Sequence, residues 1–291
     1  MAAPPVPPVP LVSRRRRLRV GDWLERAAVV VAALVILVAV VGPFVAPHDP
    51  YRVALDQSLQ PPSAEHWFGT DADGRDVFSR VLAGARVTLL ATFVVIAVAT
   101  VIGVVLGTAA ALGGRIVDEI LMRICDIGLS FPAMILALGL AAAMGPSLES
   151  AVIALALTWW PGYARLVRTL VRETLHAEYV DAARSIGMSR WRLITRHVLP
   201  NSLDTLYVQI TLDVAAVILV ISGLSFVGVG AQPPSAEWGA LVAAGRNNVV
   251  NGWWVVALPG AAIALTAIAF NLVGDRLRVR NDPTLGNGGK A

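Results

Sequence analysis

The sequence predicts an all-α polytopic membrane protein with six transmembrane helices. Hydrophobic residues make up 56% of the chain and charged residues only 15%, and the mean hydropathy is +0.67. A soluble domain has about 25% charged residues, so this composition lies far from the soluble class. The uncharged stretches are also long, and several reach the roughly 20 residues that an α-helix needs to cross a bilayer.

Six runs contain no Asp, Glu, Lys or Arg, and each is expected to form one span. They are residues 27–46, 87–114, 127–148, 150–164, 214–236 and 247–274. The fourth run is short, but its apolar pattern continues to Val171, so one tilted or protruding helix can complete that span. Gly103, Gly107 and Pro132 lie inside these runs. Bilayer helices tolerate both residue types, and small residues allow helices to approach closely.

The basic residues predict the orientation of the spans. Six spans place both termini on one side, together with 19 of the 24 Lys and Arg residues, and leave 5 on the other side. The positive-inside rule then puts both termini in the cytoplasm. Because the basic residues follow loop position and form no continuous basic domain, a nucleic-acid partner is not expected.

This topology divides the chain into consecutive segments. The expected segments are a disordered, basic cytoplasmic N-terminus over 1–26, a first transmembrane helix over 27–46, an extracytoplasmic loop over 47–86, a five-helix core over 87–276 and a cytoplasmic tail over 277–291. The core contains a polar cytoplasmic loop over 165–204. The lipid bilayer is therefore the first expected partner of the chain.

The sequence lacks the residues of a nucleotide-hydrolysing or other catalytic site. A phosphate-binding loop needs a lysine after a Gly-rich turn, and the single lysine is Lys290, next to the C-terminus. All four histidines lie in expected loops, and a lone Cys125 suggests neither redox chemistry nor a metal. We therefore expect no catalytic residues, no metal site and no cofactor bound by this chain.

The polar segment from Glu178 to Leu203 predicts two short amphipathic helices at an angle. Apolar or small residues recur at helical spacing over 179–186 and again over 191–198. Gly187 suits the left-handed residue that ends the first helix, and Pro200 should end the second because it disfavours helical geometry at Leu199. Ala182, Ala183 and Gly187 would then lie at the bend and allow another protein to approach the backbone. A loop that lies on the lipid surface is the alternative.

Two further positions have both a structural and a functional interpretation. In the outer loop, a compact turn with Asp side chains on backbone amides and Arg75 on a carboxylate could also serve as a docking surface; its members are Gly69, Asp71, Gly74, Arg75 and Asp76. If the fifth span begins before its uncharged run, near Leu206, Asp213 lies about two turns inside it and is the one carboxylate inside a span away from its ends. It could face a pathway through the membrane and meet a positively charged group of a substrate. We favour the alternative that it bonds Thr211 or a neighbouring helix near the cytoplasmic interface.

Several motifs, in order along the chain, are similar to one family. The cytoplasmic segment contains Asp181-Ala182-Ala183, then Gly187, then Val198-Leu199-Pro200-Asn201. This pattern resembles the coupling loop of binding-protein-dependent ABC importers, with Asp181 where Glu is usual. Residues 67–86, 125–132, 223–239 and 253–278 resemble further signatures of the dipeptide and oligopeptide importers, which nickel importers share. The chain is thus similar to their second, C-type, permease subunit.

The resemblance implies a fold, a mechanism and a set of partners. The fold would be that of a type I ABC importer permease in the bacterial cytoplasmic (inner) membrane. Partners would be a homologous second permease, one or two ATPase subunits that use ATP and Mg²⁺, an extracytoplasmic substrate-binding protein and a peptide substrate. The residues implied in contact with the ATPase are Tyr179, Asp181, Ala182, Ala183, Gly187, Trp191, Leu199 and Pro200.

The implied function is import of di- or oligopeptides by alternating access. Two alternatives stay open from the sequence. One is a permease for nickel or another small solute in the same family. The other is a non-transport membrane protein that recruits a cytoplasmic partner through the polar segment.

Overall fold

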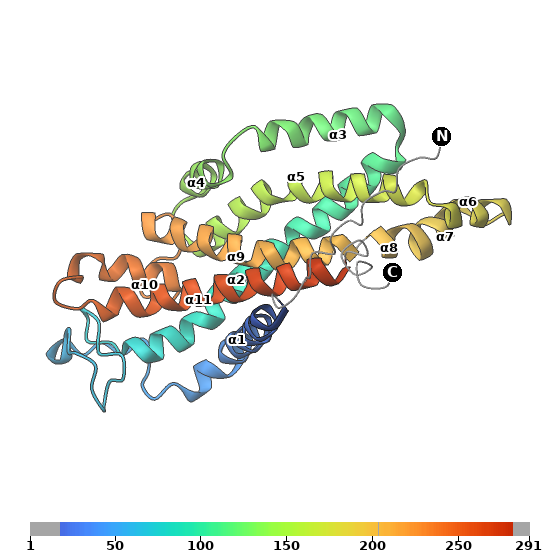
Figure 1. Cartoon of the computed structure of the whole chain (residues 1–291). Coiled ribbons are helices and arrows are strands. Elements are labelled where there is room, and N and C mark those ends of the chain that lie inside the picture. Colours follow the sequence, from blue (N-terminus) through green and yellow to red (C-terminus); the bar gives the residue numbers. More distant parts are fainter. Residues whose placement is uncertain (1–17, 203, 282–291) are drawn as a thin grey trace, which may run out of the picture.

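The computed structural model describes residues 18–202 and 204–281 and shows an elongated bundle of helices (Figure 1). Within these residues the only β-type pairing is an isolated bridge between Thr70 and Asp76. The long helices are α1 (Leu18–Val45), α2 (Val77–Leu112), α3 (Gly114–Leu129), α4 (Ala133–Met144), α5 (Leu148–Leu175), α9 (Asp204–Val227) and α11 (Trp254–Asn281). The short ones are α6 (Glu178–Ser185), α7 (Arg190–Leu193), α8 (Leu199–Ser202), α10 (Trp238–Gly245), and single turns at Leu55–Gln57, Ile194–Val198 and Arg246–Asn248.

The prediction of an all-α membrane protein is confirmed. In the described part of the chain, four helices are long and apolar enough to span a bilayer, or five if the bent pair of α3 and α4 counts as one span. Helix α5 is not among them, because no stretch of it of spanning length is apolar enough, although the helix continues past Val171 to Leu175. The count of six spans and the cytoplasmic termini stay predictions.

Two helix boundaries differ from those expected. Helix α2 begins at Val77, where the uncharged run begins only at residue 87, because Asp76 caps it by accepting a hydrogen bond from the Ser79 amide at 2.8 Å. The third uncharged run, residues 127–148, does not form one straight helix. Helices α3 and α4 meet there at 87° across a gap that contains Pro132. Proline disfavours helical geometry at the residue before it, so α3 ends and the chain turns there.

The α2–α5 contact depends on glycines, as expected for packed membrane helices. A Cβ on Gly103 would lie 2.3 Å from the Cβ of Tyr163, and one on Gly107 would lie 2.5 Å from the Ala164 carbonyl oxygen. Tyr163 and Val167 at this contact belong to a smaller buried cluster that continues toward α6–α8. The main core is separate and contains buried residues of α1, α2, α4, α5, α9, α10 and α11. Helix α3 joins α5 through ion pairs from Asp118 to Arg168 and Arg172 and from Asp126 to Arg165.

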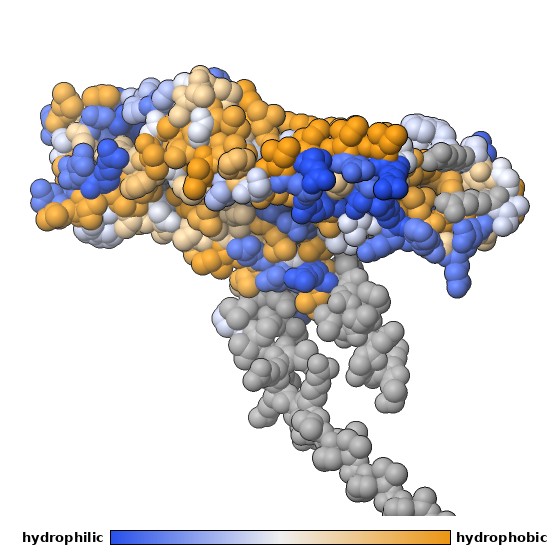
Figure 2. Space-filling view, turned by 90° about the horizontal axis from the view of Figure 1, so that it is seen from above, coloured by the Kyte–Doolittle hydropathy of each residue, from blue (hydrophilic) through white to orange (hydrophobic). Residues whose placement is uncertain are grey.

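The two ends of the bundle differ in content. The loop between α1 and α2 lies with α10 at one end, and α6, α7 and α8 form the other (Figure 1). Seen from above, hydrophobic residues cover much of the middle, and hydrophilic residues lie toward both ends, with the densest group between the middle and the end that carries α6 and α7 (Figure 2). This distribution fits a protein whose middle lies in lipid.

Candidate functional site

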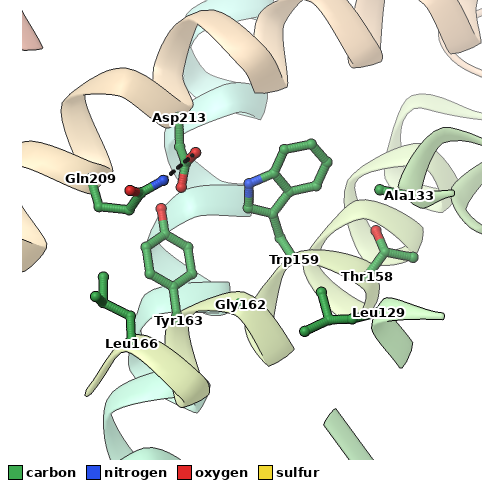
Figure 3. A pocket seen from close by; sticks show the side chains of 9 residues that line it. All are labelled: Leu129, Ala133, Thr158, Trp159, Gly162, Tyr163, Leu166, Gln209 and Asp213. Carbon is green, nitrogen blue, oxygen red and sulfur yellow. Dashed lines mark hydrogen bonds between the residues drawn. The ribbon is translucent and has the colours of Figure 1, made fainter. Parts of the chain in front are cut away.

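A cavity of about 320 Å³ lies between α5, α9 and the α3–α4 bend. Its lining residues are Leu129, Ala133, Thr158, Trp159, Gly162, Tyr163, Leu166, Gln209 and Asp213. Figure 3 shows the Asp213 carboxylate at one side of this cavity, with the Tyr163 hydroxyl and the Trp159 indole nitrogen pointing toward it. One carboxylate thus meets two aromatic side chains from a neighbouring helix.

The surroundings of Asp213 have features of both interpretations, because the residue lies beside a neighbouring helix and also lines a cavity. The Gln209 side-chain amide donates a hydrogen bond to Asp213 Oδ1 at 3.0 Å, whereas the Thr211 hydroxyl donates instead to the Tyr207 carbonyl oxygen. The expected bond with Thr211 is therefore absent, and Asp213 faces α5. The carboxylate also opens on the cavity, which the sequence alone did not reveal, because the aromatic residues around it come from a distant part of the chain.

The segment from Glu178 to Ser202 forms a bent arm, which we call the α6–α8 module. Gly187 has φ +79°, so the predicted left-handed turn between the two short helices is confirmed. The expected effect of Pro200 is wrong. Leu199 keeps helical angles, and α8 contains Pro200, because a π-helical turn at Ile194–Val198 precedes it and changes the backbone pairing.

One face of the module packs on α5 and includes a residue that was expected at the open bend. Four residues (Val180, Ala183, Leu193 and Val198) are buried against Val167 and Val171 of α5. Ala183 is only 8% exposed, so the expectation that it lies open at the bend is wrong. Helical spacing alone does not determine which of two adjacent stripes is buried, because Val180 and Tyr179 are both apolar.

The opposite face of the module exposes large apolar side chains. Tyr179 is exposed, and Ile186 and Trp191 reach 80% and 76% exposure. Asp181, Ala182, Gly187 and Pro200 are also exposed, and Leu199 is partly buried. Large apolar groups beside polar ones on a protruding arm are typical of a surface that another protein covers.

In the outer loop, the structure confirms the predicted compact turn. Asp71 Oδ1 accepts hydrogen bonds from the amides of Asp73 and Arg75, and its Oδ2 accepts one from Arg75 Nε at 2.8 Å. Gly69 and Gly74 have φ of +69° and +74°. A Cβ on Gly74 would lie 1.7 Å from the Ala54 carbonyl oxygen, so a side chain has no space there. The docking role of this turn stays a prediction.

Two buried charged residues that anchor this end were not singled out from the sequence. The Arg80 guanidinium donates to the carbonyl oxygens of Pro50, Pro234 and Ser235 and lies 3.6 Å from Asp71 Oδ2. Glu237 is fully buried, caps α10 through the amides of Gly239 and Ala240, and accepts a hydrogen bond from Thr88. Glu is not one of the residues preferred at an N-cap, and Arg80 looked like an ordinary loop residue, so neither was recognised from the sequence.

Comparison with protein families gives two matches. Residues 99–287 match the family described as binding-protein-dependent transport system inner membrane component. Residues 24–62 match the N-terminal TM domain of oligopeptide transport permease C.

Several bacterial permeases are similar to almost the whole chain. A probable D,D-dipeptide transport system permease of Escherichia coli K12 is 50% identical over 91% of this chain and 89% of its own length. A dipeptide transport system permease of Bacillus subtilis 168 is 39% identical over 93% and 84% of the two chains. A nickel transport system permease of Escherichia coli K12 is 37% identical over 90% and 95%.

Solved structures show the fold. A chain of the inward-facing MetNI methionine ABC transporter superposes with a TM-score of 0.55 at 22% identity and covers 69% of this chain and 96% of that one. An amino acid ABC transporter with histidines gives a TM-score of 0.53 at 15% identity. At these identities the likeness concerns the fold alone.

Proposed function

We infer the role of this chain from one premise: it belongs to the family of binding-protein-dependent transport system inner membrane components. It is a permease subunit of an ABC importer and a multi-pass protein of the bacterial inner membrane. All the relatives and solved structures named above are transport proteins, which favours transport over the recruitment of a cytoplasmic partner alone.

We propose that the importer carries dipeptides or oligopeptides. The observation that supports this most is the 50% identity, over 91% of the chain, to a probable D,D-dipeptide permease. Nickel is the second candidate, because a nickel permease is also 37% identical over 90% of the chain. Uptake of a labelled D,D-dipeptide, a labelled L,L-dipeptide and ⁶³Ni²⁺ by cells with and without this chain tests the substrate class. Loss of nickel uptake with unchanged peptide uptake would contradict the peptide proposal.

We propose that the energy comes from separate ATPase chains that dock on the exposed face of the α6–α8 module. This chain has no lysine suited to bind phosphate in a Gly-rich loop. ATP and Mg²⁺ would therefore be used by one or two partner ATPases, and a second permease and an extracytoplasmic binding protein would complete the importer. ATP binding would draw the ATPases together and switch the permease between outward-facing and inward-facing states.

Ala182 and Ala183 provide a matched test of this contact. Ala182 is exposed, whereas its neighbour Ala183 is packed against α5. We expect Ala182→Glu to abolish peptide uptake in proteoliposomes while the subunit remains folded and basal ATP hydrolysis persists. Ala183→Glu should instead lower the melting temperature. Normal uptake by the Ala182→Glu variant would contradict the docking proposal.

We also propose that Asp213 meets the amino group of the peptide in the substrate pathway. A carboxylate that lines a cavity within the membrane suits an ammonium group, and the Tyr163 hydroxyl and the Trp159 indole nitrogen, which point toward it, would hold it in place. Asp213→Asn should raise the KM for a free dipeptide at least tenfold and change the KM for its N-acetyl form little. Thr211→Val is the matched control, since the Thr211 hydroxyl bonds only its own helix among the described contacts. An unchanged KM for the free dipeptide would contradict this role.

A further inference from the structure

A second cluster of titratable side chains lies far from the Asp213 cavity, in the loop between α1 and α2. His48 follows the end of α1, His66 lies in the middle of the loop, and Asp76 caps α2. The three residues can each offer one ligand atom, and these atoms all lie within 4.8 Å of one another. Three segments that are separate in the sequence therefore meet at one point.

Each of the two imidazoles has one ring nitrogen that makes no hydrogen bond in the described structure. His48 Nδ1 and His66 Nε2 are buried and have no hydrogen-bond partner among the described residues. His66 as a whole is only 4% exposed. Buried polar atoms almost always have a partner, so two unpartnered nitrogens in one cluster require an explanation. A neutral imidazole nitrogen is a common ligand of transition-metal ions.

Asp76 supplies both a ligand and an orienting group. Its Oδ1 lies 2.9 Å from His66 Nδ1, and its Oδ2 lies 3.8 Å from His48 Nδ1. His48 is held in place through its backbone, whose amide donates to the Ser79 hydroxyl at 3.1 Å. A carboxylate beside a histidine ring is also the usual arrangement that fixes a metal-binding imidazole.

The surroundings favour a cation. The cluster opens on a cavity of about 320 Å³ whose charged lining consists of four carboxylates and one guanidinium, besides the two histidines. The carboxylates belong to Asp49, Asp56, Glu65 and Asp76, and the guanidinium belongs to Arg52. A cavity with this excess of negative charge concentrates cations.

We propose that His48, His66 and Asp76 bind one divalent transition-metal ion of the zinc class. Two nitrogen ligands and one carboxylate oxygen suit Zn²⁺, and three protein ligands leave the remaining position to water. The ion would join the end of α1 to the start of α2 and so hold the outer loop. The sequence alone predicted no metal site, because the two histidines and the aspartate are far apart in the chain.

Zinc titration of the purified full-length importer, after removal of metal with a chelator, tests the proposal. Isothermal titration of the wild-type complex should show one Zn²⁺ more per copy of this chain than the complex with His48→Gln. His48 is the suitable first target, because its side chain is 38% exposed and its loss disturbs packing least. Zinc should also raise the melting temperature of the wild-type complex and leave that of the variant unchanged.

Two further variants make the result specific. His176→Gln and His197→Gln change the two remaining histidines and should bind zinc as the wild type does. The His66→Gln variant should lose the zinc site if it folds. If it does not fold, the His48→Gln variant still tests the proposal. Equal zinc stoichiometry and affinity in the wild-type and His48→Gln complexes would overturn the proposal, as would the absence of any tight site in the wild type.

Discussion

The outer loop and the α6–α8 module lie at opposite ends of the bundle and are built in opposite ways (Figure 1). In the loop, charged side chains are buried and bonded to one another or to backbone groups, as Asp71, Arg75 and Arg80 show. In the module, only a narrow stripe is buried on α5, and large apolar side chains such as Trp191 face outward.

The outer loop uses buried charged groups to hold its own structure, whereas the module uses exposed apolar groups that suit contact with a partner. Buried charges are costly unless they are paired and hydrogen-bonded. Asp71, Arg75 and the Nη atoms of Arg80 have such partners, so these contacts restrain the loop. Exposed apolar groups contribute little to the isolated fold and become useful when another protein covers them. The comparison predicts that equal substitutions will change stability at the first end and function at the second.

The largest effect is expected at Gly74, where Gly74→Ala should destabilise the fold by more than about 4 kcal/mol. The residue has a positive φ, and a Cβ would lie 1.7 Å from the Ala54 carbonyl oxygen. The yield of folded, detergent-purified protein measures this effect. Gly139→Ala is the control, because nothing lies within 4 Å of its Cβ position. Normal yield and melting temperature for Gly74→Ala would show that the loop is not rigid.

Arg80→Met should destabilise the protein by about 3 kcal/mol, since it leaves buried carbonyl oxygens and part of Asp71 without a partner. The melting temperature of the purified protein measures the change. Arg86→Met removes an exposed guanidinium from the same helix and should change the melting temperature little. Equal effects of the two substitutions would contradict the anchoring role of Arg80.

A smaller effect is expected at Gly187, where Gly187→Ala should cost about 1 to 2 kcal/mol through backbone strain alone. Its φ is +79°, but nothing lies within 4 Å of its Cβ position. Hydrogen exchange should become faster over α6 and α7 and stay unchanged in the core. Gly162→Ala also meets no atoms and lies inside α5, so it should leave this exchange unaltered.

The smallest effect on stability is expected for Trp191→Ser, within about 0.5 kcal/mol, because this indole is 76% exposed. The same substitution should reduce peptide uptake if the ATPase covers the indole. Melting temperature and uptake are measured on the same preparation. A clear loss of stability with full uptake would contradict the expectation that substitutions in the α6–α8 module change function more than stability.

Local signals in the sequence were sufficient for much of this protein. Long uncharged runs predicted the membrane helices, and Gly187 and Gly74 predicted backbone turns that were both found with positive φ. Such features depend on the bilayer thickness and on φ preferences, which are properties of the segment itself. The motif order likewise resembled the family that the comparisons then showed.

Only the tertiary structure decided which side chains meet. Helical spacing could not place Ala183 inside rather than outside, because the buried stripe depends on Val167 and Val171 of another helix. Arg80 looked like a loop residue until its carbonyl partners at Pro50 and Ser235 were brought beside it. His48, His66 and Asp76 form a cluster for the same reason. The free energy of a buried charge or ligand depends on partners distant in the chain, and no local pattern encodes their position.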